Sequence, residues 1–575
     1  MSERGVIVVG GGISGLMAAL KVVEKGIPVK IFSVVRVKRS HTVCAEGGIN
    51  AALNTKGEGD SIDEHIRDTI VGGDFLAHQK PIVKLCNAAP SIIYMYDRMG
   101  VTFSRTPEGR IDLRLFGGVK KRRTAFAGAT TGQQLMYALD EQIRKYEALG
   151  LVTKHEFWSF QSVVRDGSGR GIGIIAMDMK TMELRAFPAA AVIICTGGYG
   201  HIYGRCTAST HCNGSAASSL YQQGATFANP EFVQFHPTTI PNIDKMRLIS
   251  EAVRGEGGRI WTYRNGKPWY FLEEWYPSYG NLVPRDIAAR AIYKVVREMG
   301  LGIDGKDAVY LDVTHIDRKR LDERLGGVLE KYERFMGEDP REVPMKVFPA
   351  AHYSMGGLWV DENHMTTIEG VFAAGECDYL YHGANRLGAN SLLSASFSGF
   401  EAGSRVVEYI KGKDQNTDKK WFDDELKRQN EQFKLLAAAS GDENVYALHH
   451  ELNDVMCDKV GIVRKNDELS SAITKILELK ERFKKCGTSD GSRWGNQELI
   501  FKKDLYNMLE LAHAIAAAAL LRNESRGAHY KPEFPERDDA NWAKITKVRF
   551  APDAPKFEYE DVEMSYMPPT KRDYR

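Results

Sequence analysis

The amino-acid sequence predicts an α/β fold in which separated parts of the chain contribute strands to one parallel sheet. Three apolar segments run directly into glycine: residues 6–12 (VIVVGGG), 191–200 (AVIICTGGYG) and 368–378 (IEGVFAAGECD). Glycine after a buried strand allows the tight turn that precedes a helix or a close approach of backbone to a ligand. Three such junctions, widely spaced along the chain, predict one domain assembled from discontinuous segments.

The first junction has the pattern of a strand, a helix and a second strand. A helical stretch (LMAALKVVEKG) follows the glycines, and residues 28–33 (PVKIFS) supply the next strand. Gly10, Gly12 and Gly15 fit a dinucleotide-binding turn, although a purely structural glycine turn has the same pattern. The acidic residue that normally ends the second strand and binds a ribose is replaced by Ser33, which weakens an NAD assignment.

The remaining segments indicate further domains. Residues 238–344 lack strand-to-glycine junctions and are rich in aromatic and charged residues, which indicates an inserted α+β capping domain. The pattern after residue 415 is helical, and the last fifty residues are polar and irregular. The expected organisation is a discontinuous nucleotide-binding domain at 1–237 and 345–415, a capping domain at 238–344, a helical domain at 416–525 and a C-terminal domain at 526–575.

The composition excludes several classes of function. The chain of 575 residues has 77 basic and 75 acidic residues, a net charge of +2, so no overall field attracts nucleic acid or a membrane surface. The longest apolar run, AIAAAALL at 514–521, is too short to span a bilayer, and the N-terminus lacks the pattern of a signal peptide. We therefore expect a cytoplasmic protein that reaches a membrane only through partners.

The cysteines argue against a metal site within this chain. Eight cysteines occur without any CxxC pair, at positions 44, 86, 195, 206, 212, 377, 457 and 486. This spacing is typical of neither a disulfide framework nor an iron–sulfur or zinc site, so no metal is expected. If the protein carries out redox chemistry, its electrons must leave to another molecule.

Eight segments carry a resemblance to a known family. They are RSHTVCAEGGIN, EFVQFHPT, SEAVRGEGGR, LVPRDIAAR, FPAAHYSMGG, GVFAAGECD, HGANRLGANSLLSA and SRGAHYKPEFPERDD. In this order they resemble the flavoprotein subunits of succinate dehydrogenase and quinol:fumarate reductase over essentially the whole chain. The segment SHTVCAEGGINAA is most similar to the corresponding sequence of the bacterial form that is often coupled to menaquinone. The resemblance implies a Rossmann-like FAD-binding domain and interconversion of succinate and fumarate.

His41, within RSHTVCAEGGIN, matches the histidine that in this family bonds covalently to the 8α carbon of FAD through a ring nitrogen. From the residues alone, a surface histidine capping a turn is the better interpretation. The resemblance implies an 8α-histidyl FAD, whose attachment raises the flavin reduction potential and so helps it accept a hydride from an unactivated C–C bond.

Further positions match the family's FAD contacts. They are Gly10, Gly11, Gly12, Gly15, Ser33, Ser40, His41, Thr42, Glu46, Gly47, Gly48, Ser215, Glu376, Ser391 and Leu392. Ser215 departs from the commoner pattern, because many relatives have Gly-Asp-Gly there. This departure puts one adenosine contact in doubt and leaves the cofactor assignment intact.

A site for a dicarboxylate dianion needs several convergent cations or hydrogen-bond donors. The resemblance assigns substrate binding to five residues: Phe116, His236, Ser250, His352 and Arg386. The planar guanidinium of Arg386 is suited to gripping a carboxylate with two hydrogen bonds. Without the resemblance, His236 and His352 would more often be structural histidines whose hydrogen bonds are satisfied by the protein.

Proton transfer would ordinarily be assigned to a carboxylate or a histidine, because arginine is protonated at ordinary pH. The resemblance instead implies that Arg285 transfers the proton, with Glu251 and Arg254 as its relay to solvent. In isolation, a salt bridge between Arg285 and the adjacent Asp286 at a helix start is the better interpretation.

The resemblance also implies partners: an iron–sulfur subunit and a haem-containing membrane anchor with the quinone site. The chain would then lie on the cytoplasmic side of the cell membrane, held there by these subunits. Two other enzymes share the fold, L-aspartate oxidase and soluble fumarate reductase, but His41 and the absence of a CxxCH haem motif argue against both. A binding or assembly protein without turnover would need a lost catalytic residue, and none is lost.

Overall fold

The computed structural model describes residues 5–241, 245–413 and 418–574. Its central element is a five-stranded sheet in the order β19-β10-β1-β2-β6, with every neighbouring pair parallel. The strands are β1 (Val6–Val9), β2 (Val29–Ser33), β6 (Val152–Glu156), β10 (Ala191–Ile194) and β19 (Val371–Ala373). The three strand-to-glycine junctions therefore meet in one sheet, which confirms the predicted discontinuous α/β fold.

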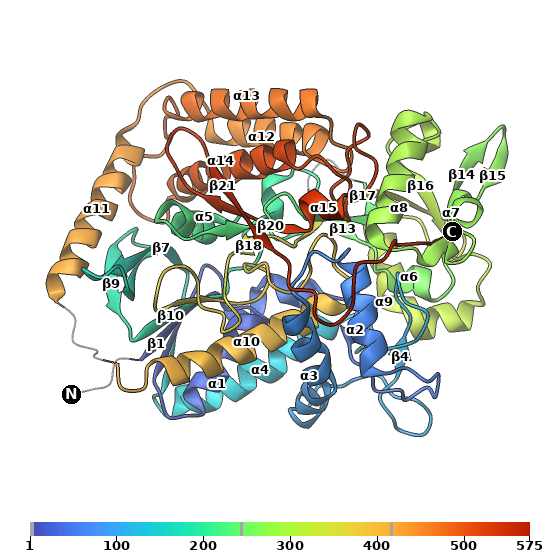
Figure 1. Ribbon diagram of the computed structural model, residues 1–575, viewed down its shortest axis with the longest axis horizontal. Helices are drawn as coiled ribbons and strands as arrows, with labels where there is room; N and C mark the ends of the chain where they lie inside the picture. The colour runs from blue at the N-terminus through green and yellow to red at the C-terminus, as the bar shows by residue number, and fades with distance from the viewer. Residues whose placement is uncertain (1–4, 242–244, 414–417, 575) are drawn as a thin grey trace.

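Helices and a small sheet cover the two faces of this parallel sheet. The helices α1 (Ile13–Val23), α4 (Thr131–Ala148) and α10 (Asn390–Tyr409) pack together on one side, with α3 (Gln79–Arg98) and α2 (Ile62–Gly72) beyond them (Figure 1). The antiparallel sheet of β7 (Trp158–Arg165), β8 (Gly171–Asp178) and β9 (Leu184–Pro188) contacts β2 and β10. Because both faces are covered, the inner strands β1 and β10 are wholly apolar and buried, whereas the edge strand β6 (VTKHE) is mostly polar and only partly buried.

A second sheet forms the green region of Figure 1 and is expected to be the capping domain. It has six strands in the order β13-β12-β17-β16-β14-β15. Their bounds are β12 (Val233–Ile240), β13 (Arg247–Leu248), β14 (Arg259–Arg264), β15 (Lys267–Trp269), β16 (Val309–Asp312) and β17 (Met345–Ser354). Helices α6 (Ala252–Gly255), α7 (Phe271–Trp275), α8 (Arg285–Tyr293) and α9 (Arg318–Met336) accompany them. The boundary expected at 237/238 falls inside β12.

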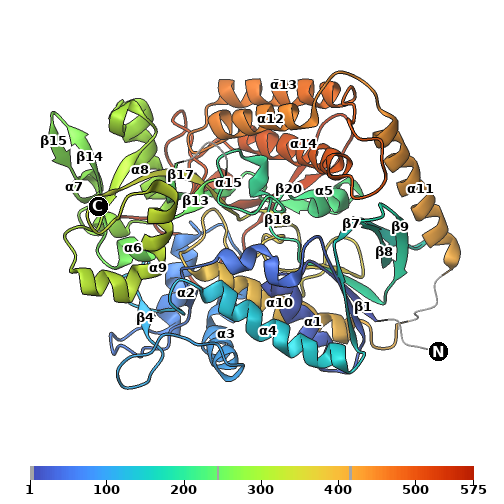
Figure 2. The same cartoon turned by 180° about the vertical axis from the view of Figure 1, so that it is seen from behind.

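The C-terminal third contains four long helices and a hairpin. The helices are α11 (Lys419–Ala438), α12 (Val445–Lys459), α13 (Asn466–Phe483) and α14 (Gln497–Leu521), of which the last three pack together (Figure 2). Beyond the short α15 (Asp539–Trp542), β20 (Lys544–Arg549) and β21 (Lys556–Asp561) pair with each other, and β20 also pairs with β11 (Phe227–Ala228). The sheet is completed by β18 (Gly357–Leu358), which pairs with β11.

The expected boundary at 415–416 and the expected domain ends at residues 1–4 and 575 lie outside the described residues. No helix among the described residues is both long and apolar enough to cross a membrane.

Candidate active site

A cavity of about 570 Å³ lies between the parallel sheet, the capping region and the first turns of α14. It is lined by nearly all the residues that sequence analysis selected. These are Gly10, Gly11, Gly12, Ser33, Ser40, His41, Thr42, Glu46, Gly47, Gly48, Phe116, Ser215, His236, Ser250, Glu251, Arg285, His352, Glu376, Arg386, Ser391 and Leu392. The two exceptions are Gly15, buried inside α1, and Arg254, which lies behind Glu251.

The glycine turn before α1 is shaped to receive an anion. Gly10 has a φ of +112°, and a Cβ added there would lie 2.0 Å from the carbonyl oxygen of Cys195. A Cβ on Gly15 would lie 1.9 Å from the carbonyl oxygen of Gly10, so the helix packs directly on the turn. No acidic residue occupies the first turn of α1. The helix N-terminus therefore offers backbone donors and a favourable dipole to a phosphate.

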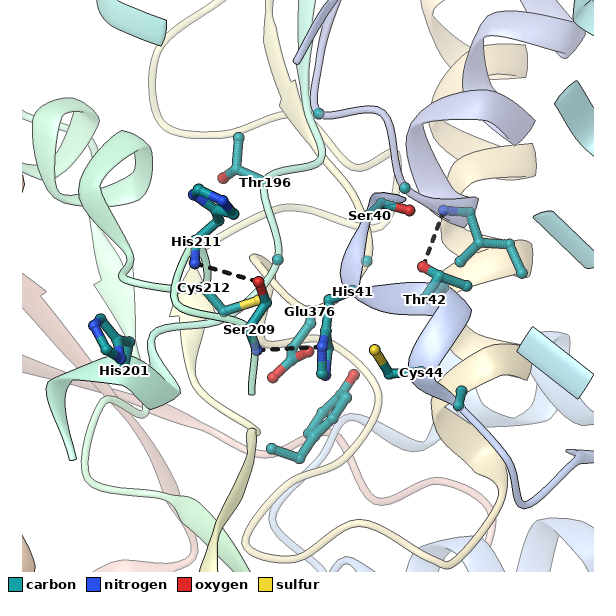
Figure 3. Close-up of a pocket in the computed structure, with 18 of the residues that line it drawn as sticks. Ser40, His41, Thr42, Cys44, Thr196, His201, Ser209, His211, Cys212 and Glu376 are labelled. Carbon is teal, nitrogen blue, oxygen red and sulfur yellow. Dashed lines mark hydrogen bonds between the residues drawn. The ribbon is translucent and has the colours of Figure 1, made fainter. Parts of the chain in front are cut away.

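His41 begins the short 3₁₀ helix η2 (His41–Cys44) on one wall of the cavity. The backbone N–H of Ser209 donates to Nδ1 of His41 at 3.2 Å, and this bond crosses the space between the two walls in Figure 3. Burial, with a smaller contribution from Lys245, lowers the pKa of His41 to about 4. The ring is therefore neutral at pH 7 with Nδ1 as an acceptor, which leaves Nε2 as the nitrogen for another partner. The ring lines the cavity and is bonded to a segment that lies far away in the sequence.

Other predicted cofactor contacts have partners within the protein. The hydroxyl of Thr42 accepts a hydrogen bond from the backbone N–H of Ile13 at 3.3 Å, which joins η2 to the start of α1. Glu376 accepts from the backbone N–H of Ser354 at 3.0 Å, and burial raises the pKa of Glu376 to about 7. Glu46 forms an ion pair with Lys331 of α9, which links the glycine pair at 47–48 to the capping region.

The cavity has a second end in which the buried histidines are neutral. His236 on β12 and His352 on β17 lie on paired strands, with ring centroids 5.0 Å apart. Burial, followed by the charge of Arg285, lowers the pKa of each well below its ordinary value. Nε2 of His236 is buried without a hydrogen-bond partner, while Nδ1 of His352 lies 2.7 Å from the hydroxyl of Thr207. An unpartnered buried nitrogen in a cavity is a ready contact for a ligand.

Arg386 lines this end of the cavity with only part of its hydrogen-bonding capacity used. One nitrogen donates to Oε1 of Gln234 at 3.2 Å and another to the carbonyl oxygen of Leu387 at 3.3 Å, whereas Nε is buried without a partner. The guanidinium also lies 4.4 Å from the ring centroid of Tyr353. Burial, then Arg285, lowers the pKa of Arg386 to about 9, so the side chain remains cationic at pH 7.

Glu251 lies between two arginines and is fully buried. Its Oε2 accepts from Nε of Arg285 at 2.8 Å and from Nη2 of the same residue at 2.6 Å, and its Oε1 accepts from Nη2 of Arg254 at 2.8 Å. Burial raises the pKa of Glu251, but Arg285 and Arg254 hold it below its ordinary value. Arg254, Arg285, Arg386 and Glu251 together leave a surplus of two positive charges.

One aromatic ring and one hydroxyl group complete the end of the cavity that contains the arginines. Phe116 is buried, and a Cβ added to Gly47 would lie 2.8 Å from its ring, so the ring packs directly against Gly47. Ser250 is also buried, and its hydroxyl accepts a hydrogen bond from the backbone N–H of Ala252 at 3.3 Å. The predicted substrate residues are therefore brought together from β12, β17 and three connecting segments.

The interpretation that pairs Arg285 with Asp286 is wrong. Arg285 donates to Glu251 and Gln234, whereas Asp286 accepts from Asn385, Arg290 and Arg572. Both residues lie in the first turn of α8, but consecutive helical side chains point in different directions.

Several residues that shape the cavity are not predicted from the sequence. Gln234, within the quoted segment EFVQFHPT, bonds both Arg285 and Arg386 through its Oε1. At the opposite end, Asp504 of α14 lines the cavity and is hydrogen-bonded by Ser215, and burial raises its pKa to about 6. The position of Gln234, two residues before His236, could have indicated its role. Nothing local indicates Asp504, because α14 reaches the cavity from a distant part of the sequence.

Comparison with known proteins gives consistent matches over the whole chain. A family model described as an FAD binding domain matches residues 5–392, and one described as fumarate reductase flavoprotein C-term matches residues 449–574. The succinate dehydrogenase flavoprotein subunit of Bacillus subtilis is 56% identical over 100% of this chain and 99% of its own length.

Two sets of solved structures share the fold closely. An Escherichia coli quinol fumarate reductase subunit superposes with a TM-score of 0.93 at 32% identity, over 99% of this chain and 98% of its own. Mycobacterium smegmatis Sdh1, solved in complex with UQ1, superposes with a TM-score of 0.84 at 30% identity, over 99% and 95%.

Proposed function

The chain belongs to the family of succinate dehydrogenase and fumarate reductase flavoprotein subunits, and on that premise we propose that Arg285, Glu251 and Arg254 move the proton in its interconversion of succinate and fumarate. The protein is an FAD-binding oxidoreductase and the catalytic subunit of such a complex. The family and the fold predicted from the sequence are thereby confirmed.

One observation carries the assignment of residue roles. Three buried guanidiniums and one buried carboxylate leave two uncompensated positive charges at one end of the cavity, which matches the charge of a dicarboxylate dianion. Buried charges without compensation are costly, so a site of this kind is stabilised by a ligand of opposite charge. Arg386 would hold one carboxylate, and the neutral imidazoles of His236 and His352 would donate hydrogen bonds to the substrate oxygens.

The residues at the other end of the cavity fit FAD. The glycine turn and the N-terminus of α1 would hold the diphosphate, and Ser391 and Leu392 at the start of α10 would lie against the flavin. FAD, when bound, supplies the acceptor for a hydride, which carries two electrons. We expect Nε2 of His41 to bond covalently to its 8α carbon, because Nδ1 is already occupied by the N–H of Ser209.

Succinate loses one hydride and one proton from neighbouring carbons to become fumarate. In the direction of fumarate reduction, Arg285 donates a guanidinium proton to carbon. Glu251 bonds both Arg285 and Arg254, so the lost proton is replaced along this chain of groups. In the direction of succinate oxidation, the same groups act in the reverse order. Ser250 and Phe116 orient the substrate and exclude water from the reacting carbons.

The complex is proposed to contain an iron–sulfur subunit and a haem-containing membrane anchor that reacts with quinone. A two-electron carrier needs an acceptor, and the described part of the chain contains no group of three or more His, Cys, Asp or Glu side chains that could hold a metal. Two structural relatives support a quinone partner, since one is a quinol fumarate reductase and another was solved with UQ1. The subunit would then be attached peripherally at the cytoplasmic side of the membrane.

The experiment that tests this function combines activity with peptide analysis. Purified protein is assayed for dye reduction with succinate and, separately, with L-aspartate, and the denatured protein is digested with trypsin. We expect turnover with succinate only, and flavin fluorescence together with the FAD mass on the peptide that contains His41. Turnover with aspartate, or flavin released intact by acid, would instead support a soluble oxidase of the aspartate type.

A further inference from the structure

The C-terminal tail, residues 563–574, crosses from the FAD-binding region to the capping region. Figure 1 shows this red segment ending against the green helices and strands of the capping region. At its start, the backbone N–H of Gln79 donates to the carbonyl oxygen of Glu563 at 3.1 Å. At its end, Tyr574 is buried in the apolar core of the capping region, with its ring centroid 5.1 Å from that of Tyr279.

Arg572 in this tail holds two buried carboxylates that come from different parts of the fold. Its guanidinium lies 2.9 Å from Oδ2 of Asp286 in α8 and 3.3 Å from Oδ2 of Asp74, which follows α2. A second nitrogen of the guanidinium donates to Oδ1 of Asp286 at 3.2 Å. Both aspartates and Arg572 have side chains at most 8% exposed. A planar guanidinium with two nitrogens on one carboxylate fixes its orientation as well as its charge.

Asp286 is connected to the catalytic arginines through two amide side chains. Nδ2 of Asn385 donates to Oδ1 of Asp286 at 2.9 Å, and Oδ1 of Asn385 accepts from Nε2 of Gln234 at 2.8 Å. Oε1 of Gln234 then accepts from Arg285 at 3.0 Å and from Arg386 at 3.2 Å. Because an amide has one donor end and one acceptor end, the orientation of each member of this series determines that of the next.

A second cavity, of about 250 Å³, lies on the far side of the same arginines. Arg285 and Arg386 line both this cavity and the larger one. Its remaining walls include Gly117, Gly118 and Pro284, and residues 571–574 of the tail form another wall. The tail therefore lies directly against the space behind the catalytic arginines.

We propose that Arg572 is a positioning residue for the reaction, which sets the orientation of Arg285 through Asp286, Asn385 and Gln234 and, with the rest of the tail, forms one wall of the space behind it. The inference rests on the proposed role of Arg285. Asp286 is the second residue of the helix that Arg285 begins, so the bond to Arg572 also fixes the first turn of α8. Removing Arg572 takes a charged partner away from the buried carboxylate of Asp286, and this destabilises the first turn of α8.

Arg386 depends less on this series than Arg285 does. Arg386 keeps its bond to the carbonyl oxygen of Leu387 and its contact with the ring of Tyr353 when Gln234 shifts. Among the described residues, Arg285 is hydrogen-bonded only to Gln234 and Glu251. Loss of Arg572 should therefore impair turnover more than it impairs binding of a dicarboxylate.

The test compares Arg572→Ala, Arg572→Lys and the matched control Arg537→Ala in the flavin-loaded protein. Arg537 also pairs with Asp74, at 2.8 Å, but its other ion pair is with Asp539 and not with Asp286. For Arg572→Ala we expect kcat for fumarate reduction to fall about 10- to 100-fold. The dissociation constant of malonate, a dicarboxylate that cannot react, should change by less than about threefold. Arg572→Lys should retain part of the rate of the unmodified protein, and guanidinium ion added to Arg572→Ala should restore part of it. Arg537→Ala should keep the rate of the unmodified protein.

Hydrogen–deuterium exchange supplies a readout that does not depend on turnover. We expect faster exchange in the peptide containing residues 285–293 in Arg572→Ala and unchanged exchange there in Arg537→Ala. An unchanged kcat in Arg572→Ala, equal losses in both alanine variants, or a loss of malonate binding as large as that of kcat would overturn the inference. Failure of the unmodified protein to convert either substrate would instead refute the proposed function, and the exchange comparison alone would then decide whether Arg572 fixes α8.

Discussion

Nη2 of Arg285 lies 2.6 Å from Oε2 of Glu251, at a point where the carboxylate is fully buried and its other oxygen is bonded to Arg254. Burying a carboxylate between two guanidiniums costs free energy, because all three charged groups lose their hydration. The arrangement explains how an arginine can transfer a proton, since its lost proton is replaced through a neighbour that is already hydrogen-bonded to it.

Replacing Glu251 by glutamine should preserve the shape of the site and break the proton relay. The amide presents donor hydrogens at one of the two positions that now accept from arginine, so at least one bond to Arg285 or Arg254 is lost. We expect kcat to fall about 10²- to 10⁴-fold, the range for loss of a general acid–base group. Steady-state fumarate reduction measures this, with Glu256→Gln as control because Glu256 pairs with Arg320 and Arg324 outside the cavity. An unimpaired Glu251→Gln enzyme would exclude the relay.

Replacing Arg386 by lysine should weaken substrate binding, because an ammonium keeps the charge but cannot place two parallel donors on a carboxylate. A hydrogen bond to a charged group contributes about 1.5–3 kcal/mol, so the dissociation constant of malonate should rise about 10- to 100-fold. Isothermal titration checks this, with the exposed Arg549→Lys as control. If malonate binds equally well to Arg386→Lys, Arg386 is not the residue that grips the carboxylate.

His65 should make folding stability depend on pH. The residue is 0% exposed, its Nε2 lies 3.1 Å from Oδ1 of Asn390, and burial lowers its pKa to about 3. As the pH falls below about 6.5, the unfolded chain binds a proton that the folded chain does not, so stability decreases toward acid pH.

One such group contributes a loss of about 1.4 kcal/mol per pH unit between about pH 6 and pH 3. Urea unfolding at several pH values should therefore show a shallower acid decline in His65→Gln, which keeps a donor for Asn390 and cannot titrate. The same pH dependence in both proteins would show that folding does not lower the pKa of His65.

The parts of this structure that could be predicted from the sequence are those with local signals. The junction at residues 6–12 predicts both a buried strand and a turn, because strand, glycine and helix are adjacent in the chain. The hairpin of β20 and β21 is not predicted by the sequence, because each of its strands is rich in charged residues and contains only two large apolar side chains.

The site was found mainly through family resemblance, because its members are distant in sequence. Nothing local indicates that Arg285 bonds Glu251 in place of the adjacent Asp286, since that choice depends on how α8 packs against β12. Arg572 lies in a polar, irregular tail, and only the folded chain brings it to Asp286. Side chains that act through such long-range contacts carry no periodic or spacing signal.

The most direct test of the central claim is the rate of fumarate reduction by Arg285→Lys, measured alongside the binding of malonate to the same protein. Lysine keeps a positive charge but cannot reproduce the bonds to both Glu251 and Gln234. The proposed mechanism predicts that turnover falls by about 10²-fold or more while malonate still binds. Turnover close to that of the unmodified protein would contradict it, because a residue other than Arg285 would then deliver the proton.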